Sequence, residues 1–415
     1  MRLCPIFKWS EQAPGKPAVS TPNEMISYRQ LNHLIQLQCG YIKSLNLPKQ
    51  SRLVFIAENS VETLCFFFAA WRMQMIACPL SFRLPSEAVS QTLKRLNSSL
   101  LVPQMGQLEK AEEIDEDLLA TMLLTSGSTG QPKIACHRLR HLLTSAQNAL
   151  VPLNLESHDY YLASLPYFHV GGISLLLRTF LCGATLFLSQ NYFDPRITHL
   201  SLVPTQLYRL LQEKPEHFHP KCLLLGGAPI PSRLIEESAN LNLYTTYGMT
   251  ETSSMIIVNG KVLDHLELKL GKDEEILIRG KSLFEGYLNS EGMIESPLID
   301  GWFHTKDRGS LNTNGELQFL GRKDRLFISG GENIQPEEIE EAILSIFKLK
   351  QALIIPYQDE EFGMRPAAYL YDPDQRVSLL SLQKELKRIL PGYKIPQKLF
   401  YLSHIYTKEE IKNLI

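Results

Sequence analysis

The segment from Thr125 to Lys133 combines small, hydroxylated and basic residues in a way that suits the binding of phosphate groups. It reads Thr-Ser-Gly-Ser-Thr-Gly-Gln-Pro-Lys and follows a short apolar run that predicts a buried strand, residues 121–124. Glycines let backbone amides approach a ligand closely, hydroxyls donate hydrogen bonds to phosphate oxygens, and the lysine adds a positive charge. The segment is not a Walker A loop, because no Gly-Lys-Ser or Gly-Lys-Thr closes it. A polar surface turn is the alternative explanation.

Further groups that could take part in chemistry follow downstream. An apolar strand runs into three small residues, 226–228, against which a flat ligand could lie. Three polar motifs come after it: Tyr247-Gly248-Met249-Thr250-Glu251, Thr305-Lys306-Asp307 and Gly321-Arg322-Lys323-Asp324. Taken one at a time, each has an ordinary alternative. Tyr247 could pack in a core, Glu251 could be a solvated turn residue, and Arg322 could form a surface ion pair with Asp324.

These motifs need a scaffold, and the hydrophobic pattern predicts an α/β fold. Short continuous apolar runs of strand length alternate with helical patterns, which favours parallel pairing. The predicted strands are 53–57, 76–80, 100–103, 160–165, 184–188, 199–203 and 222–225, and the predicted helices include 61–75, 86–96 and 173–181. From about residue 260 the pattern becomes one of alternating strands and turns, which predicts a small antiparallel β segment. A helix from Pro336, strands 352–356 and 367–370, and a helix 379–390 follow. We therefore expect a large N-terminal domain, residues 1–323, and a small α+β C-terminal domain, residues 324–415.

Composition excludes several classes of partner. The chain has 415 residues, 44% hydrophobic and 21% charged, with a formal net charge of -2. Such a balance gives no long-range field toward nucleic acid or an anionic membrane, so any anion site must be built locally. The seven cysteines are widely spaced and form no CxxC pair, which favours free thiols in a reducing compartment. No signal-peptide pattern and no membrane-length apolar stretch is present in the sequence. We expect a cytoplasmic protein without an integral membrane segment.

The four motifs, in this order in one chain, resemble the core motifs of the acyl-adenylate-forming enzymes, which include acyl-CoA synthetases, peptide-synthetase adenylation domains and luciferases. The resemblance covers residues from about 18 to 400 and implies an AMP-binding N-terminal domain followed by a mobile C-terminal domain. It implies that a carboxylate attacks the α-phosphorus of ATP, that Mg²⁺ assists, and that the acyl-adenylate then reacts with coenzyme A. Asp324 matches the position of the family hinge, although an exposed linker aspartate would look the same in sequence.

The resemblance also implies roles for individual residues. The phosphates of ATP would contact Thr125, Ser126, Gly127, Ser128, Thr129, Gly130 and Lys133. The adenine and its surroundings would involve Gly226, Gly227, Ala228, Thr246, Tyr247 and Gly248. Thr250 would contact the α-phosphate, Glu251 would bind Mg²⁺, and Asp307 and Arg322 would hold the ribose hydroxyls. The catalytic residues implied in this way are Lys133, His169, Thr250 and Glu251.

Further stretches resemble one subgroup, the o-succinylbenzoate–CoA ligases of menaquinone biosynthesis: residues 201–207, 225–231, 329–338 and 359–366. This resemblance places His169 beside the reacting carboxylate and makes Arg178 a second substrate-binding residue. A dianionic aryl acid leaves one carboxylate unreacted, and a guanidinium in an apolar wall can hold it. Two alternatives stay open: Arg178 could be a helix arginine whose head reaches water, and His169 could be packed in a core.

One departure from the family pattern concerns the C-terminus. Members carry a lysine there that reaches the active site for adenylation, and here Ile405 occupies its place; Lys408 or Lys412 would serve only in a shifted register. The leading hypothesis is a working ligase that takes 2-succinylbenzoate, ATP and coenzyme A. The alternatives are a degenerate protein that binds ATP or acyl-adenylate without full turnover, and a CoA ligase for another aromatic or medium-chain acid. Assembly as a homodimer is also left open.

Overall fold

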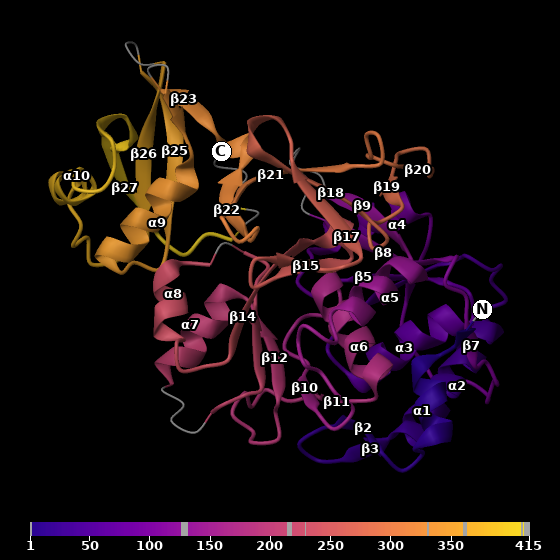
Figure 1. Ribbon diagram of the computed structural model, residues 1–415. Helices are drawn as coiled ribbons and strands as arrows, with labels where there is room; N and C mark the ends of the chain where they lie inside the picture. The colour runs from indigo at the N-terminus through magenta and orange to yellow at the C-terminus, as the bar shows by residue number, and fades with distance from the viewer. Residues whose placement is uncertain are drawn as a thin grey trace.

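The computed structural model describes residues 2–125, 132–213, 218–228, 230–329, 332–359, 363–407 and 410. Within these residues, two large sheets and the helices around them make up most of the chain, and a smaller α/β unit forms its C-terminal part (Figure 1). This arrangement confirms the predicted α/β class, with a large N-terminal part, a small β segment and a small C-terminal part.

The larger sheet has nine strands in the described chain, in the order β16-β15-β14-β13-β12-β10-β11-β2-β3. Its bounds are β2 (Pro17–Ser20), β3 (Met25–Ser27), β10 (Tyr160–Leu162), β11 (Thr185–Phe187), β12 (His199–Leu202), β13 (Cys222–Leu225), β14 (Leu243–Met249), β15 (Ser254–Val258) and β16 (Lys261–Val262). The strands from β2 to β14 along this order pair in parallel, as their continuous apolar runs predict. β14 then turns back antiparallel as β15.

The second sheet has seven described strands in the order β20-β19-β9-β8-β5-β4-β6. Its bounds are β4 (Arg52–Ile56), β5 (Ile76–Leu80), β6 (Leu100–Leu101), β8 (Leu119–Thr125), β9 (Lys133–Arg138), β19 (Gly286–Leu288) and β20 (Ile294–Glu295). One half of this sheet is parallel, whereas β8, β9, β19 and β20 pair antiparallel. Between β6 and β8 lies the short strand β7 (Glu113–Ile114), which pairs with β1 (Arg2–Leu3).

The helices of the N-terminal part are α1 (Pro5–Gln12), α2 (Tyr28–Ser44), α3 (Val61–Arg72), α4 (Ser86–Leu96), α5 (Leu139–Asn148), α6 (Val170–Cys182), α7 (Pro204–Gln212) and α8 (Ser232–Glu237). Ser27 caps α2 in a capping box with Gln30. α3 and α6 are apolar on nearly all sides and lie in the largest core, where Phe68 of α3 packs edge-on against Phe180 of α6. The only charged residue of α6 is Arg178.

A four-stranded antiparallel sheet follows, in the order β17-β18-β21-β22, with β17 (Leu266–Leu270), β18 (Glu275–Gly280), β21 (Phe303–Leu311) and β22 (Leu317–Arg322). It confirms the predicted antiparallel β segment. A turn lies at Asp300 and Gly301, which both have positive φ between the bridged residues Ile299 and Trp302.

The C-terminal part begins after the single 3₁₀ turn η3 (Lys323–Arg325). Its elements are β23 (Phe327–Ser329), β24 (Glu332–Ile334), α9 (Pro336–Phe347), β25 (Ala352–Asp359), β26 (Gly363–Leu370), α10 (Leu379–Leu386) and β27 (Lys398–Tyr401). The strands form one sheet, and α9 packs against it through a hydrophobic core separate from those of the N-terminal part (Figure 1). Arg325 is tied to this part by ion pairs to Glu337 and Glu340 at 2.9 and 2.7 Å. The domain boundary at residue 324 stays a prediction. In the described chain no helix is both long and apolar enough to cross a lipid bilayer.

Candidate active site

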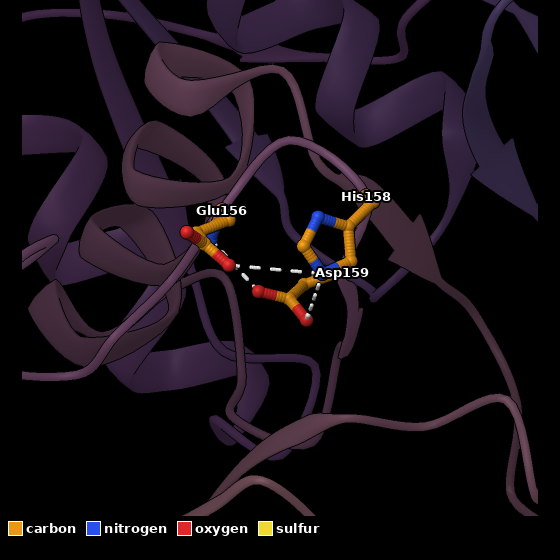
Figure 2. A group of neighbouring side chains, drawn as sticks. All are labelled: Glu156, His158 and Asp159. Carbon is orange, nitrogen blue, oxygen red and sulfur yellow. Dashed lines mark hydrogen bonds and ion pairs between the residues drawn. The ribbon is translucent and has the colours of Figure 1, made fainter.

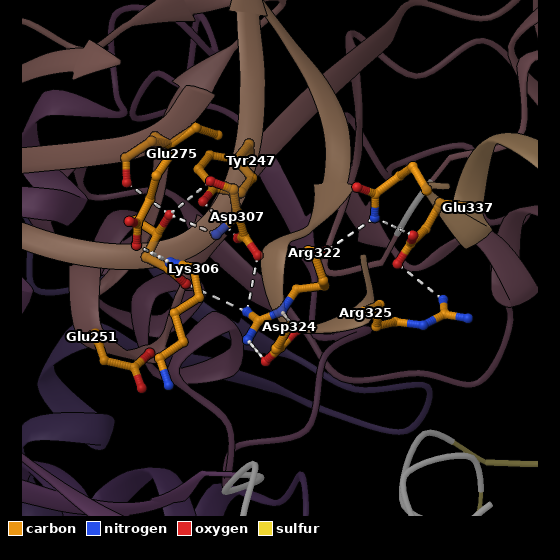
Figure 3. Close-up of polar contacts among 12 residues, drawn as sticks. Tyr247, Glu251, Glu275, Lys306, Asp307, Arg322, Asp324, Arg325 and Glu337 are labelled. Atoms are coloured by element: carbon orange, nitrogen blue, oxygen red, sulfur yellow. Dashed lines mark hydrogen bonds and ion pairs between the residues drawn. The ribbon is translucent and has the colours of Figure 1, made fainter. Parts of the chain in front are cut away.

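Three motifs that are far apart in the sequence meet at Asp307. The β21–β22 register places Asp307 directly opposite Arg322, and Arg322 Nη1 donates to Asp307 Oδ1 at 2.9 Å. Tyr247, in β14, donates its phenol hydrogen to the other oxygen, Oδ2, at 2.7 Å. Figure 3 shows the three side chains converging between the four-stranded sheet and β14. The structure therefore brings together Tyr247, Asp307 and Arg322, as a shared nucleotide site requires.

The pKa values of Asp307, Arg322 and Asp324 are shifted by burial and by the charges of their neighbours. Asp307 is 5% exposed, and burial raises its pKa, while the adjacent Arg322 offsets part of that increase. Burial alone would lower the pKa of Arg322, but its hydrogen bonds to Asp324 and the charge of Asp307 outweigh burial and raise it. Arg322 contacts Asp324 at 3.1 Å through Nε and 2.7 Å through Nη2, a bidentate pair. Despite partial burial, that pairing lowers the pKa of Asp324.

The glycines at 226 and 248 have a packing reason of their own. A Cβ added at Gly226 would lie 2.4 Å from Thr246 Cγ2, and one added at Gly248 would lie 2.1 Å from the carbonyl oxygen of Ser254. Bare backbone at these positions is therefore required by the close approach of β13, β14 and β15. Gly227 has φ +76°, a conformation that favours glycine. The predicted contacts of residues 226–228, Thr246 and Gly248 with adenine stay predictions.

The turn after β14 holds Thr250 and Glu251 in the 3₁₀ turn η1 (Thr250–Thr252). It is followed by two serines with positive φ, Ser253 at 59° and Ser254 at 111°. Such non-glycine residues cost about 1–3 kcal/mol each and cluster at functional sites. The fully buried His137 of β9 contacts Ser253 Oγ through Nδ1 at 3.0 Å and so supports this turn. The sequence motifs contained no signal for His137.

Glu251 and Lys133 both contact Tyr287, a residue that sequence reasoning missed. Tyr287 Oη donates to Glu251 Oε1 at 2.6 Å, and Lys133 Nζ lies 4.5 Å from the centroid of the same ring. The backbone carbonyl of Glu251 accepts a hydrogen bond from the Phe284 amide at 2.9 Å. The contacts of Tyr287 depend on strand register between distant segments, so local sequence could not reveal them.

The predicted phosphate loop is bounded by paired strands. Thr125 ends β8, Lys133 begins β9, and the two are direct antiparallel partners. The five residues between them with predicted phosphate contacts, Ser126, Gly127, Ser128, Thr129 and Gly130, lie outside the described residues, as do Lys408 and Lys412. The apolar run before the loop is a buried strand, as predicted.

Of the two predicted acid-binding residues, His169 lies just before α6 and Arg178 lies within it. His169 precedes the helix and is exposed, with its ring 4.6 Å from that of Phe168, so the core-packing alternative is wrong. Arg178 is 1% exposed, so the alternative of a head that reaches water is also wrong. Its Nη1 lies 3.6 Å from Met255 Sδ, and its Cζ lies 5.5 Å from the Tyr161 ring centroid. Among the described residues no ion pair joins Arg178 to a carboxylate, and its Nε has no hydrogen-bond partner.

A separate group of potential metal ligands lies before β10, at Glu156, His158 and Asp159 (Figure 2). Their ligand atoms lie within 4.8 Å of one another. The ammonium of Lys221 already contacts Glu156 Oε2 at 3.0 Å and Asp159 Oδ2 at 3.1 Å. Because a lysine balances the two carboxylates, we interpret the group as a structural ion cluster beside β13.

Comparison with known proteins agrees with this geometry. The family model described as "AMP-binding enzyme" matches residues 6–111 and 103–288. The chain is 31% identical to the 2-succinylbenzoate–CoA ligase of Haemophilus influenzae over 91% of this chain and 88% of that protein. It is also 31% identical to the ligase of the same name from Escherichia coli, over 91% of this chain and 89% of that protein.

Solved structures give the same result for the fold. The o-succinylbenzoate coenzyme A synthetase of Bacillus subtilis in complex with AMP superposes with a TM-score of 0.90 at 26% identity, covering 100% of this chain and 98% of that one. The Escherichia coli enzyme, with a bound phenylether-linked analogue of OSB-AMS, superposes with a TM-score of 0.86 at 29% identity, covering 100% of this chain and 99% of that one. The chain therefore belongs to the AMP-binding enzyme family of acyl-adenylate-forming ligases, and its similarity to 2-succinylbenzoate–CoA ligases extends over both its large and its small part.

Proposed function

We propose that the protein is an ATP-dependent acid–CoA ligase that converts 2-succinylbenzoate to 2-succinylbenzoyl-CoA in menaquinone biosynthesis. In the first step a substrate carboxylate oxygen bonds to the α-phosphorus of ATP, and the bond to pyrophosphate breaks. In the second step the sulfur of coenzyme A bonds to the acyl carbon, the thiol proton is lost, and AMP leaves. The observation that carries the proposal is the convergence of Tyr247, Asp307 and Arg322 in a chain whose curated relatives carry this activity.

The described residues fit a nucleotide. Each oxygen of Asp307 already accepts one hydrogen bond, and a carboxylate oxygen can accept a second from a ribose hydroxyl. The guanidinium of Arg322 holds that carboxylate in place. Tyr247 is half-buried at the end of β14, where its ring would lie against the adenine. Thr125 and Lys133 hold the two ends of the predicted phosphate loop, and Lys133 lies against the ring of Tyr287, which binds Glu251.

Glu251 fits a hard divalent cation, because its carboxylate is half-buried and one of its oxygens is held by Tyr287. Bound there, Mg²⁺ would offset negative charge on the phosphates as pyrophosphate leaves. Thr250, in the same turn, would contact the α-phosphate. A Bacillus subtilis o-succinylbenzoate coenzyme A synthetase, 26% identical to this chain, has been solved with ATP and magnesium ion.

The substrate class follows from the buried guanidinium of α6. A charged group that is 1% exposed and has no carboxylate partner in the described chain would be stabilised by an anionic ligand. We infer that Arg178 holds the unreacted carboxylate of a dicarboxylic acid, while His169 lies beside the reacting one. Coenzyme A is the thiol substrate in this proposal, and Asp324 is the hinge about which the C-terminal part turns between the two steps.

A second candidate function rests on Ile405. This residue stands where the family carries its adenylation lysine, and its side chain is exposed and apolar, with no charge to offer a phosphate. A protein that binds ATP or acyl-adenylate but forms new adenylate very slowly would fit this observation. All seven thiols are free in the structure, which supports a cytoplasmic location for either function.

Pyrophosphate release over a panel of acids tests these alternatives. The proposed function predicts release with 2-succinylbenzoate, ATP, Mg²⁺ and coenzyme A, and much less with benzoate or medium-chain acids. Binding of ATP without release from any acid would support the second candidate. Release from other acids only would make the protein a ligase of different specificity. Sedimentation of the same preparation would test the homodimer.

A further inference from the structure

Strand register places Tyr287 near the start of β9. β19 pairs antiparallel with β9, so that Tyr287 lies opposite Ala135. Lys133 is two residues before Ala135 and therefore points to the same face of the sheet. Ala135 is fully buried and contributes only a methyl group, which leaves room for the tyrosine ring to reach the diagonal neighbour, Lys133.

The residues around Tyr287 hold it at this position. A Cβ added at Gly286, which precedes it, would lie 2.3 Å from the carbonyl oxygen of Glu295, so the β19–β20 hairpin requires glycine there. Its ring also packs edge-on against Phe284 at 4.8 Å, and the Phe284 amide binds the backbone of Glu251. β19 and the turn that carries Glu251 are therefore joined both through backbone and through the phenol of Tyr287.

Tyr287 makes one contact with each of two opposite charges. Its hydroxyl donates to the Glu251 carboxylate, while its ring face receives the Lys133 ammonium. Among the described residues no ion pair joins Lys133 to Glu251, and the ammonium of Lys133 lies over the Tyr287 ring instead.

Without the ring, these two charges would be free to approach each other. An ammonium and a carboxylate about 4 Å apart attract in water and attract more strongly in a partly buried site. Such an ion pair would occupy the carboxylate needed by the metal ion and the ammonium needed by a phosphate. A ligand would then have to break the pair before it could bind.

We propose that Tyr287 is a positioning residue of the ATP site: it binds Glu251 through its hydroxyl and Lys133 through its ring, and so keeps the two charges apart and available. The inference rests on the proposed function, since the ligands it invokes are Mg²⁺ and ATP. It adds a requirement that the motifs do not contain, namely an aromatic hydroxyl between the carboxylate and the lysine.

Binding of ATP, measured by calorimetry without acid substrate or coenzyme A, tests the inference apart from turnover. Tyr287→Phe keeps the ring and loses the hydroxyl, so we expect the Mg²⁺ concentration for half-maximal ATP binding to rise by about 3- to 10-fold. ATP affinity without Mg²⁺ should stay within about twofold, because the ring still holds Lys133. Tyr287→Leu should weaken ATP binding about tenfold even without Mg²⁺, because Lys133 becomes paired.

Two further variants sharpen the test. Adding Glu251→Gln to Tyr287→Leu removes the partner of Lys133 and should restore Mg²⁺-free ATP affinity. Tyr401→Phe, which removes one hydroxyl bonded to the Val377 carbonyl in the C-terminal part, is the matched control and should bind ATP as the wild type does.

The positioning role is overturned if Tyr287→Leu binds ATP like the wild type, or if Glu251→Gln fails to restore its affinity. It is also overturned if Tyr287→Phe shows no change in Mg²⁺ dependence; should Tyr287→Leu not fold, this measurement decides alone. A wild-type protein that binds ATP with Mg²⁺ but turns over no acid would remove the proposed function and leave this inference standing.

Discussion

Replacing Arg178 with methionine should have opposite effects on substrate binding and on the stability of the free protein. The side chain is 1% exposed, and in the described structure its contacts are Met255 Sδ at 3.6 Å and the Tyr161 ring. Methionine has a similar length and no charge, so it can fill the space beside Met255. The substitution therefore removes the guanidinium with little change in packing.

The expected magnitudes follow from these contacts. A hydrogen bond to a charged group contributes about 1.5–3 kcal/mol, so loss of the carboxylate contact should raise the KM for 2-succinylbenzoate by about 10- to 150-fold. The KM for ATP should not change. In the free protein the guanidinium is buried without a carboxylate partner among the described residues, and its replacement by an apolar group should leave the free energy of unfolding unchanged or raise it by about 1–4 kcal/mol.

The assay compares 2-succinylbenzoate with monocarboxylic aromatic acids in pyrophosphate release, alongside urea unfolding of the free protein. Arg72→Met is the matched control, because Arg72 is 5% exposed but donates to the Ala111 carbonyl at 3.1 Å and contacts Cys4 Sγ at 3.2 Å. It should lower stability and leave the preference between acids unchanged. The reasoning about Arg178 is refuted if Arg178→Met affects mono- and dicarboxylates equally, or if it lowers stability as Arg72→Met does.

Three other perturbations test separate parts of the structure. Lys221→Met leaves the 1%-exposed carboxylate of Asp159 without its ammonium, so the free energy of unfolding in urea should fall by about 3 kcal/mol; an unchanged value would contradict the ion-cluster interpretation. Asp307→Asn weakens the link between Tyr247 and Arg322 and should raise the Kd for ATP by about 10-fold or more in calorimetry, whereas unaltered ATP binding would exclude Asp307 from the ribose site. Burial lowers the pKa of His137 to about 3 and that of His141 to about 4, from an ordinary value of 6.5. Because the unfolded chain takes up these protons first, stability should be complete above about pH 6.5 and fall by about 1.4 kcal/mol per pH unit for each histidine as the pH drops toward those values. Unfolding curves that coincide between pH 5 and pH 7 would contradict the buried neutral state.

The features that sequence could predict are those set by local patterns. Continuous apolar runs such as 53–57 and 222–225 became parallel strands, because burial on both faces imposes that pattern. The capping box of Ser27 and Gln30 is also a local pattern, because a capping residue acts within one helical turn. The order of the four motifs was enough to predict that Tyr247, Asp307 and Arg322 share a site.

The features that sequence could not predict depend on register and burial. β9 carries a continuous buried run next to a glycine-rich loop. Its pairing with β19, which brings Tyr287 to Lys133, joins segments about 150 residues apart, and no local pattern specifies that pairing. A single arginine in an apolar helix can extend to water or stay inside, and only the neighbours of Arg178 decide between the two. His137 supports the turn after Glu251 through a contact between residues 116 positions apart, which no local motif encodes.

Formation of 2-succinylbenzoyl-CoA, followed by mass spectrometry together with AMP and pyrophosphate, tests the central claim most directly. The account predicts that the purified protein, supplied with 2-succinylbenzoate, ATP, Mg²⁺ and coenzyme A, forms the thioester, AMP and pyrophosphate in equal amounts. ATP binding without thioester, or thioester from other acids but not from 2-succinylbenzoate, would contradict it.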